Sequence, residues 1–137
     1  MAINTKNMTA QDLIKTEIII GASNHNRLIP DITYENINDI FDELSEDEAW
    51  EEAIYDSQSS MRESGDDCNL RCNAYSNHYE CEQVAYKVLS GEWVSWTYWF
   101  GGGKHADPDS IDWISDAYLL DVVETSKIVI HREFTKK

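Results

Sequence analysis

Carboxylates dominate the residues of this sequence whose type and spacing could do chemistry. Between Leu28 and Met61 the chain carries eleven Asp and Glu residues and neither Lys nor Arg. If the 26 residues from Asp31 to Asp56 are helical, a rise of about 1.5 Å per residue places one charge roughly every 3.5 Å. One strand of DNA presents a phosphate about every 3.4 Å. The spacing therefore predicts an array of phosphate-like anions that suits a basic protein surface built to hold nucleic acid.

Eight of these acidic residues are the candidates for contact with such a partner. Each carboxylate could pair with Arg or Lys in a charge-assisted hydrogen bond. The alternative is an acidic face that is simply solvated, because charged side chains are mostly exposed in any folded protein. The candidates are Glu35, Asp39, Asp42, Glu43, Glu46, Asp47, Glu51 and Glu52.

A glycine-rich loop, Gly-Gly-Gly-Lys-His at residues 101–105, is a secondary candidate site. A phosphate-binding P-loop requires Gly where this chain has Tyr98 and a hydroxyl residue where it has His105. The P-loop interpretation therefore fails, and Lys104 and His105 are left as a loop that could orient a partner. The alternative is a turn whose glycines supply positive φ.

Four potential zinc ligands, Cys68, Cys72, His78 and Cys81, lie within fourteen residues. Their types suit a structural Cys3His site, but the spacing lacks the usual Cys-x2-Cys knuckle. Small-residue packing with an exposed His is the alternative. We predict no bound metal and no cofactor, and keep a small zinc-binding protein as an alternative. The four histidines are scattered and match no nucleophile, so we predict no catalytic residue and no enzyme.

Size and composition indicate a single folded domain over residues 1–137. The apolar content of 42% and aromatic content of 11% are too high for a disordered acidic tail. A formal net charge of -15 disfavours direct binding to nucleic acid or to anionic membranes. No signal peptide or membrane span is visible, which predicts a cytoplasmic protein with reduced cysteines.

The elements that would position the candidate residues begin with a short helix over residues 10–15, capped by Thr9 with Asp12. The β-branched run 18–20 favours a buried strand, and Asn24, Asn26 and Pro30 favour a loop.

Helical periodicity follows Pro30. One helix carries an inner face of Ile37, Ile40, Phe41 and Leu44. Ser45 with Glu48 is a capping-box signature for a second helix, which turns Trp50, Ala53 and Ile54 inward and ends before Gly65.

From about Ser76 the pattern is typical of a sheet. Runs 79–88 and 93–100 alternate around Ser90-Gly91 and predict a β-hairpin. Its aromatic residues suit a core on one face and a protein contact, including a homodimer contact, on the other. Asp107-Pro108 predicts a helix with the inner face Ile111, Ile114 and Tyr118. The alternation of Ile128, Ile130 and Phe134 predicts a terminal strand over residues 127–134. The expected fold is α+β, an antiparallel sheet of three or four strands with the acidic helices on one face.

The segment 78–134 resembles a small family of bacteriophage and prophage proteins that has no assigned activity. The residues that carry the resemblance are His78-Tyr79-Glu80, Trp96-x-Tyr98-Trp99, Gly101-Gly102-Gly103-Lys104-His105 and Asp112-Trp113.

In size and charge the whole chain is similar to phage-encoded acidic DNA mimics that disarm restriction or CRISPR machinery. These likenesses imply an inhibitor that binds a basic nucleic-acid-binding protein in the host cytoplasm. The alternative is a module that binds a protein through the aromatic hairpin and the loop 101–105.

Overall fold

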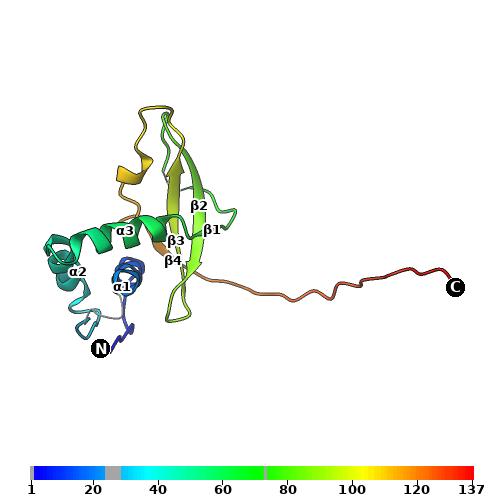
Figure 1. Ribbon diagram of the computed structural model, residues 1–137, viewed down its shortest axis with the longest axis horizontal. Helices are drawn as coiled ribbons and strands as arrows, with labels where there is room; N and C mark the ends of the chain where they lie inside the picture. The colour runs from blue at the N-terminus through cyan, green and yellow to red at the C-terminus, as the bar shows by residue number, and fades with distance from the viewer. Residues whose placement is uncertain (1, 24–28, 73) are drawn as a thin grey trace.

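The computed structural model describes residues 2–23, 29–72 and 74–137, and within them three helices pack on one face of a four-stranded antiparallel sheet (Figure 1). This arrangement confirms the predicted α+β class. The sheet order is β1-β2-β3-β4, so each strand pairs with its neighbours in sequence. The elements are α1 (Ala10–Ala22), α2 (Ile37–Glu46), α3 (Glu51–Arg62), β1 (Asp66–Asp67), β2 (Glu80–Lys87), β3 (Trp93–Phe100), a 3₁₀ turn η1 (Pro108–Ser110) and β4 (Tyr118–Leu120).

One continuous helix, α1, replaces the predicted short helix and strand. Thr9 and Asp12 form the expected capping box. The helix then runs through the β-branched residues, with Ile18 and Ile19 both fully buried. Because α1 contacts α2, α3 and β3, most of its circumference is covered, and a helix covered all round shows little amphipathic periodicity. The prediction of a strand at residues 18–20 was wrong. A helix that is buried on several sides has consecutive apolar residues in its sequence, and a buried strand has the same pattern.

Helices α2 and α3 follow the predicted inner faces. Ile37, Ile40 and Ile54 are buried, and Phe41 and Leu44 pack against the same core. The predicted start of the second helix was wrong: the Ser45 hydroxyl donates to the Phe41 carbonyl at 2.7 Å instead of capping a new helix.

The link between α2 and α3 is a turn organised by Asp47. Its carbonyl accepts from the backbone N–H groups of Trp50 at 2.9 Å and Glu51 at 2.8 Å, and its side chain accepts from Ala49 N at 2.8 Å. Asp47 therefore satisfies backbone donors at the start of α3, which is the role the sequence suggested for Ser45.

The predicted hairpin forms the centre of the sheet. Strands β2 and β3 pair over eight residues each, from Glu80 opposite Phe100 to Lys87 opposite Trp93. Gly91 occupies the turn with a φ of 90°, which an L side chain rarely adopts. Val84, Val94 and Trp96 belong to the buried core that the helices cover.

The other face of the hairpin buries a polar triad of Gln83, Ser95 and Thr97. Gln83 Nε2 donates to Ser95 Oγ at 2.9 Å, and Thr97 Oγ1 donates to Gln83 Oε1 at 3.0 Å. Ser95 Oγ also donates to the Val84 carbonyl at 2.8 Å. All three side chains are at most 4% exposed, so these hydrogen bonds offset the cost of removing polar groups from water.

After the hairpin the sequence predicted a helix beginning at Asp107 and a strand over residues 127–134, and the structure contains neither. The predicted helix after Asp107 is reduced to η1, because the Asp112 side chain accepts from Ile114 N at 3.1 Å and from Ser115 N and Oγ, holding a local turn. The hydrogen bond from the Ser115 side chain also lowers the pKa of Asp112. The predicted terminal strand 127–134 is absent, since residues 121–137 extend away from the sheet (Figure 1).

The predicted turn residues Asn24 and Asn26 lie outside the described residues. Among the helices of the described part, none is long and apolar enough to cross a membrane.

A pH-dependent contact ties α1 to the hairpin turn. Glu17 Oε1 accepts from the backbone N–H of Leu89 at 2.5 Å. Burial raises the pKa of the Glu17 carboxyl, and this hydrogen bond opposes the rise only in part. The folded protein therefore holds the Glu17 proton more tightly than the unfolded chain does.

We expect Glu17→Gln to be increasingly stabilising relative to the parent protein as the pH rises from about 4 to about 7. The raised pKa of Glu17 contributes stability below the ordinary carboxyl pKa, and this contribution is lost as the pH rises through the raised value. Glutamine keeps an acceptor for Leu89 and carries no charge. Urea denaturation across this pH range measures the difference. Glu82→Gln, at an exposed position, is the control and should give a flat difference; a flat difference for Glu17→Gln would contradict the prediction.

Candidate functional site

The eight predicted contact residues lie along the segment from Glu35 to Glu52, and we call this set the acidic helical surface. Glu35 precedes α2, four of the residues lie on α2, Asp47 lies in the link, and two lie in the first turn of α3. All eight side chains are exposed. Within the described residues, both ion pairs involve Arg62, so none of these carboxylates is neutralised by a salt bridge. The residues are Glu35, Asp39, Asp42, Glu43, Glu46, Asp47, Glu51 and Glu52.

The surface follows two helices instead of one straight line. The turn at residues 47–50 separates α2 from α3, and the two helices do not share an axis (Figure 1). The regular spacing calculated for a single helix therefore does not extend over the whole run. The charges form a bent array whose two arms meet at Asp47.

Packing holds this array in place. Ile37 and Ile54 are at most 3% exposed, and Trp50 and Ala53 pack against the same core. Burying each large apolar side chain contributes roughly 1.5–3 kcal/mol relative to exposure. The carboxylates are thus presented by anchored helices, as the apolar periodicity of the sequence predicted.

Helix dipoles make the two ends of the array unequal. Asp39 in α2 and Glu51 and Glu52 in α3 lie in first turns, where the dipole favours negative charge. The last turn of α2 contains no basic residue, and Glu46 ends the helix where the dipole disfavours an anion. A cationic partner at this end would relieve the repulsion.

A shallow hollow of about 590 Å³ lies beside the acidic residues of α3. Glu51 and Glu52 line it together with the ring of Tyr55, which is 68% exposed. An aromatic face next to two carboxylates suits a guanidinium group, which can stack on the ring and donate to the carboxylates. Sequence reasoning did not select Tyr55, although its position directly after Ile54 on an amphipathic helix predicts exposure.

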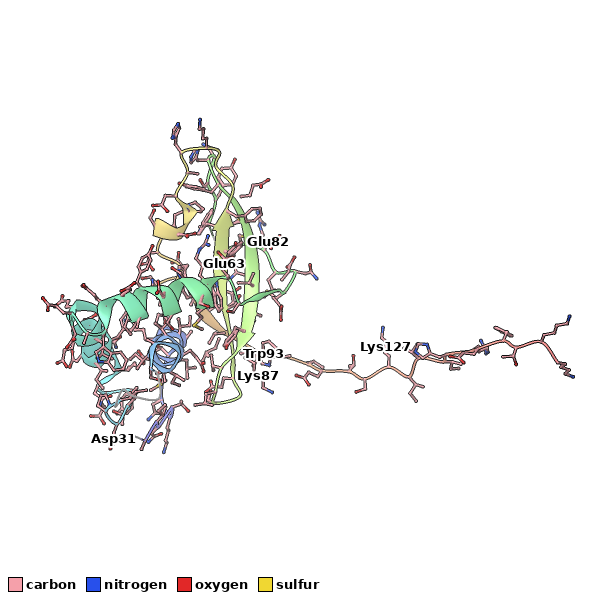
Figure 2. All side chains as sticks on the ribbon, in the orientation of Figure 1. Asp31, Glu63, Glu82, Lys87, Trp93 and Lys127 are labelled. Atoms are coloured by element: carbon pink, nitrogen blue, oxygen red, sulfur yellow. The ribbon has the colours of Figure 1, made fainter. Side chains whose placement is uncertain are left out.

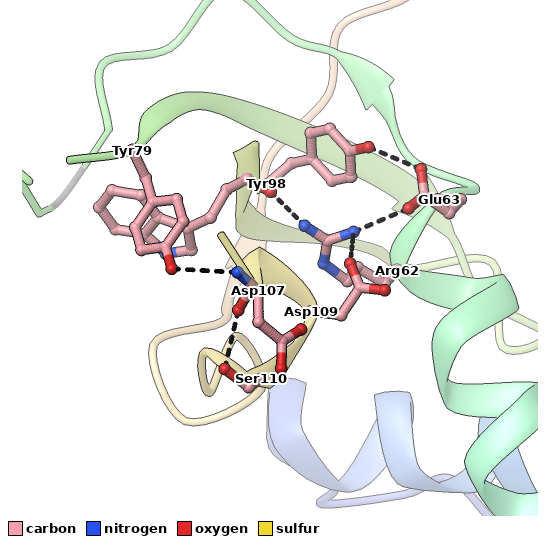
Figure 3. Close-up of polar contacts among 8 residues, drawn as sticks. Arg62, Glu63, Tyr79, Tyr98, Asp107, Asp109 and Ser110 are labelled. Atoms are coloured by element: carbon pink, nitrogen blue, oxygen red, sulfur yellow. Dashed lines mark hydrogen bonds and ion pairs between the residues drawn. The ribbon is translucent and has the colours of Figure 1, made fainter. Parts of the chain in front are cut away.

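Arg62 anchors the other end of α3 to the sheet (Figure 3). Its side chain is 4% exposed, and Nη1 lies 2.8 Å from Asp109 Oδ1 and 2.7 Å from Glu63 Oε1. Nη2 donates to the carbonyl of Trp99 in β3. The guanidinium carbon also lies 4.5 Å from the centre of the Tyr98 ring. One side chain therefore connects α3, β3 and η1.

Tyr98 closes this cluster. Its hydroxyl donates to Glu63 Oε2 at 2.7 Å, and the hydrogen bond to that carboxylate raises the pKa of Tyr98.

Arg62 was not among the residues selected from sequence. Its spacing of eight residues from the inward-facing Ile54 is the signal that places it on the inner face of α3.

We expect Arg62→Met to lower the free energy of unfolding by about 2–4 kcal/mol. Methionine can fill much of the space, but it removes the donor to the Trp99 carbonyl and both ion pairs. Urea denaturation measures the change. Arg71→Met, at an exposed position, should change stability by less than about 0.5 kcal/mol. Equal effects of the two substitutions would contradict the anchoring role.

The glycine-rich loop lies at the end of the hairpin away from its Gly91 turn (Figure 1). Lys104 and His105 are exposed, and the helix expected to follow them is only η1. The loop is shaped by Gly102, which has a φ of 87° and lies against the Tyr79 ring. The structure therefore does not join Lys104 and His105 to the acidic helical surface.

We expect Gly102→Ala to destabilise the protein by about 1–3 kcal/mol more than Gly103→Ala. Both glycines have positive φ, so both substitutions carry the same backbone strain. Only the Cβ at Gly102 would meet other atoms, at 2.7 Å from Tyr79 and 2.8 Å from Ala106, whereas Gly103 has open space. Thermal unfolding compares the two variants, and equal melting temperatures would exclude the steric argument.

The cysteines lie near one another, but they do not form a metal site in the described residues. Cys72 interacts with Cys81, and Cys68 Sγ donates to the Gln83 carbonyl at 3.2 Å. Burial, followed by the neighbouring Cys81, raises the pKa of Cys72 to about 12, which favours the neutral thiol near neutral pH. His78 instead packs edge-on against Tyr79 at 4.7 Å. No group of three or more His, Cys, Asp or Glu side chains in the described part is placed to hold a metal ion.

The aromatic side chains of the hairpin are mostly internal. Trp96 is fully buried and Trp99 is 7% exposed, while Trp93, Tyr98 and Phe100 are half-buried. Trp96 packs against Trp113 at a ring distance of 5.0 Å. Trp96 therefore belongs to the core, Tyr98 packs against it, and none of the five side chains is fully exposed, which weakens the alternative of an aromatic binding face.

Comparison of the chain with protein-family models, with curated proteins and with solved structures found no match.

Proposed function

We propose that this protein inhibits a basic nucleic-acid-binding protein by occupying the surface that normally holds nucleic acid. The observation that carries the proposal is the acidic helical surface: six of its eight exposed carboxylates stand on two anchored helices, Glu35 and Asp47 flank α2, and none forms a salt bridge among the described residues. Arg and Lys side chains arranged for phosphates would find an acceptor at each of these positions.

The electrostatics of the surface support binding over simple solvation. Like charges three or four residues apart on a helix, such as Asp39 with Asp42 and Glu43, destabilise it by a few tenths of a kcal/mol per pair. The uncompensated C-terminus of α2 adds to this cost. A cationic partner would reduce the repulsion between the carboxylates and would also stabilise the C-terminus of α2. Binding would therefore remove two unfavourable contributions to the free energy of the unbound protein.

The biological setting we propose is a bacteriophage-type inhibitor acting in the host cytoplasm on a restriction or CRISPR nuclease. This setting rests on the resemblance of segment 78–134 to phage and prophage proteins and on the likeness of the chain to acidic DNA mimics in size and charge. The target is the nuclease, and the protein itself performs no catalysis.

The test begins with capture of the target from host lysate and its release by duplex DNA. Displacement of a fluorescent duplex from the captured nuclease then measures binding. We expect the triple substitution Glu35→Lys, Asp39→Lys and Asp42→Lys to raise the concentration needed for displacement by at least about tenfold. These positions are exposed, so the fold should persist, and circular dichroism checks this.

The matched control makes the same change of charge elsewhere, at Glu80, Glu82 and Asp116, which are also exposed. Lysine at these three positions should alter displacement by less than about threefold. Equal losses in the two variants would mean that net charge alone governs binding. Salt gives a second criterion: the affinity should fall at least about tenfold between about 50 and 200 mM salt, and a flat curve would refute mimicry.

A further inference from the structure

The C-terminal arm, residues 121–137, carries apolar side chains without cover. The arm extends away from the sheet on the side opposite the helices, and its side chains stand clear of the body (Figures 1 and 2). Exposed fractions are 97% for Ile128, 71% for Ile130 and 89% for Phe134. None of its residues makes a hydrogen bond or ion pair with another described residue. Contiguous exposed apolar surface of this kind marks an interaction site.

The arm also differs from the rest of the chain in charge. Residues 125–137 contain four of the eleven Lys and Arg residues and one of the 26 Asp and Glu residues. In an extended chain alternate side chains share a face, so Ile128, Ile130 and Phe134 lie together with the basic Arg132. This segment therefore presents apolar groups and positive charge on one side, which fits an apolar groove with acidic edges.

Such a groove lies at the base of the arm. It has a volume of about 420 Å³ and is lined by residues of all four strands; Ala85 and Trp93 alternate with the core residues Val84 and Val94, so the groove lies on the face of the sheet away from the helices. Leu70, Ala85 and Trp93 supply apolar walls, and Leu70 is 47% exposed. Asp66 and Asp67 of β1 supply negative charge.

We propose that the arm binds this groove in a second copy of the chain, by reciprocal exchange between two molecules. Val122 and Val123, at the start of the arm, themselves line the groove beside Leu120 of β4, so a two-fold axis near the base brings each groove beside the other molecule's arm. Residues 128–134 lie five to eleven residues beyond Val123, a reach of roughly 17–36 Å in an extended chain. The exchange leaves the acidic helical surface free, because the helices cover the opposite face of the sheet, and it does not depend on the proposed function.

Sedimentation of the full chain over about two decades of concentration tests the proposal. We expect a concentration-dependent dimer in the parent protein. The double substitution Ile128→Asp with Ile130→Asp should raise the dissociation constant at least about tenfold, because it removes the two apolar anchors. Val129→Asp with His131→Asp makes the same change of charge on the other face of the arm and should retain the dimer.

A complementation experiment isolates the contact between arm and groove. Leu70→Asp alters the groove and leaves the arm intact, so this variant and the double arm variant should each be mainly monomeric at a concentration at which the parent protein is dimeric. An equimolar mixture should recover dimer, because one intact arm can then meet one intact groove. A monomer at every concentration, a dimer insensitive to the arm substitutions, equal loss in the arm control, or no recovery in the mixture of folded variants would each overturn the proposal. Circular dichroism confirms that each variant is folded.

Discussion

The burial of Arg62 is the interaction on which the arrangement of the layers depends. A guanidinium group can be removed from water only if its donors are satisfied, and here the acceptors come from three separate parts of the chain: Glu63, the Trp99 carbonyl and Asp109. The position of α3 on the sheet is therefore coupled to the path of the chain after the hairpin. Because α3 also carries part of the acidic helical surface, a contact at one end of the helix determines how carboxylates at its other end face a partner.

Sequence patterns predicted the elements in which one local signal dominates. The predictions of the inner face of α2 and of the hairpin around Gly91 were correct. Helical side-chain periodicity identifies the buried face of α2, and the turn residues identify where the chain reverses between β2 and β3. The prediction failed at residues 18–20, where burial on several sides removes the amphipathic contrast, and after Asp107, where the Asp112 side chain competes for backbone donors. Residues 127–134 have the alternation of a strand, but a strand needs a neighbour that no local pattern supplies.

The candidate site was predictable in composition and only partly in geometry. The identity and exposure of the eight acidic residues follow from their place opposite Ile37 and Ile54 on amphipathic helices. The bend at Asp47 and the hollow beside Tyr55 depend on how α2 and α3 meet over α1, which is a property of packing. A basic partner would consequently have to match a bent surface, so charge alone does not define which partner fits.

The buried triad of Gln83, Ser95 and Thr97 has a consequence for how the hairpin pairs. A slip of β2 by one residue against β3 would move Gln83 to the opposite face of the sheet and leave Ser95 and Thr97 without their partner. Apolar side chains alone would tolerate such an error more easily, because Val84 and Ala85 are both small enough to exchange places. A hairpin in the wrong register would bury the polar atoms of the triad without hydrogen-bond partners, which costs free energy. The triad therefore favours the native register of β2 against β3.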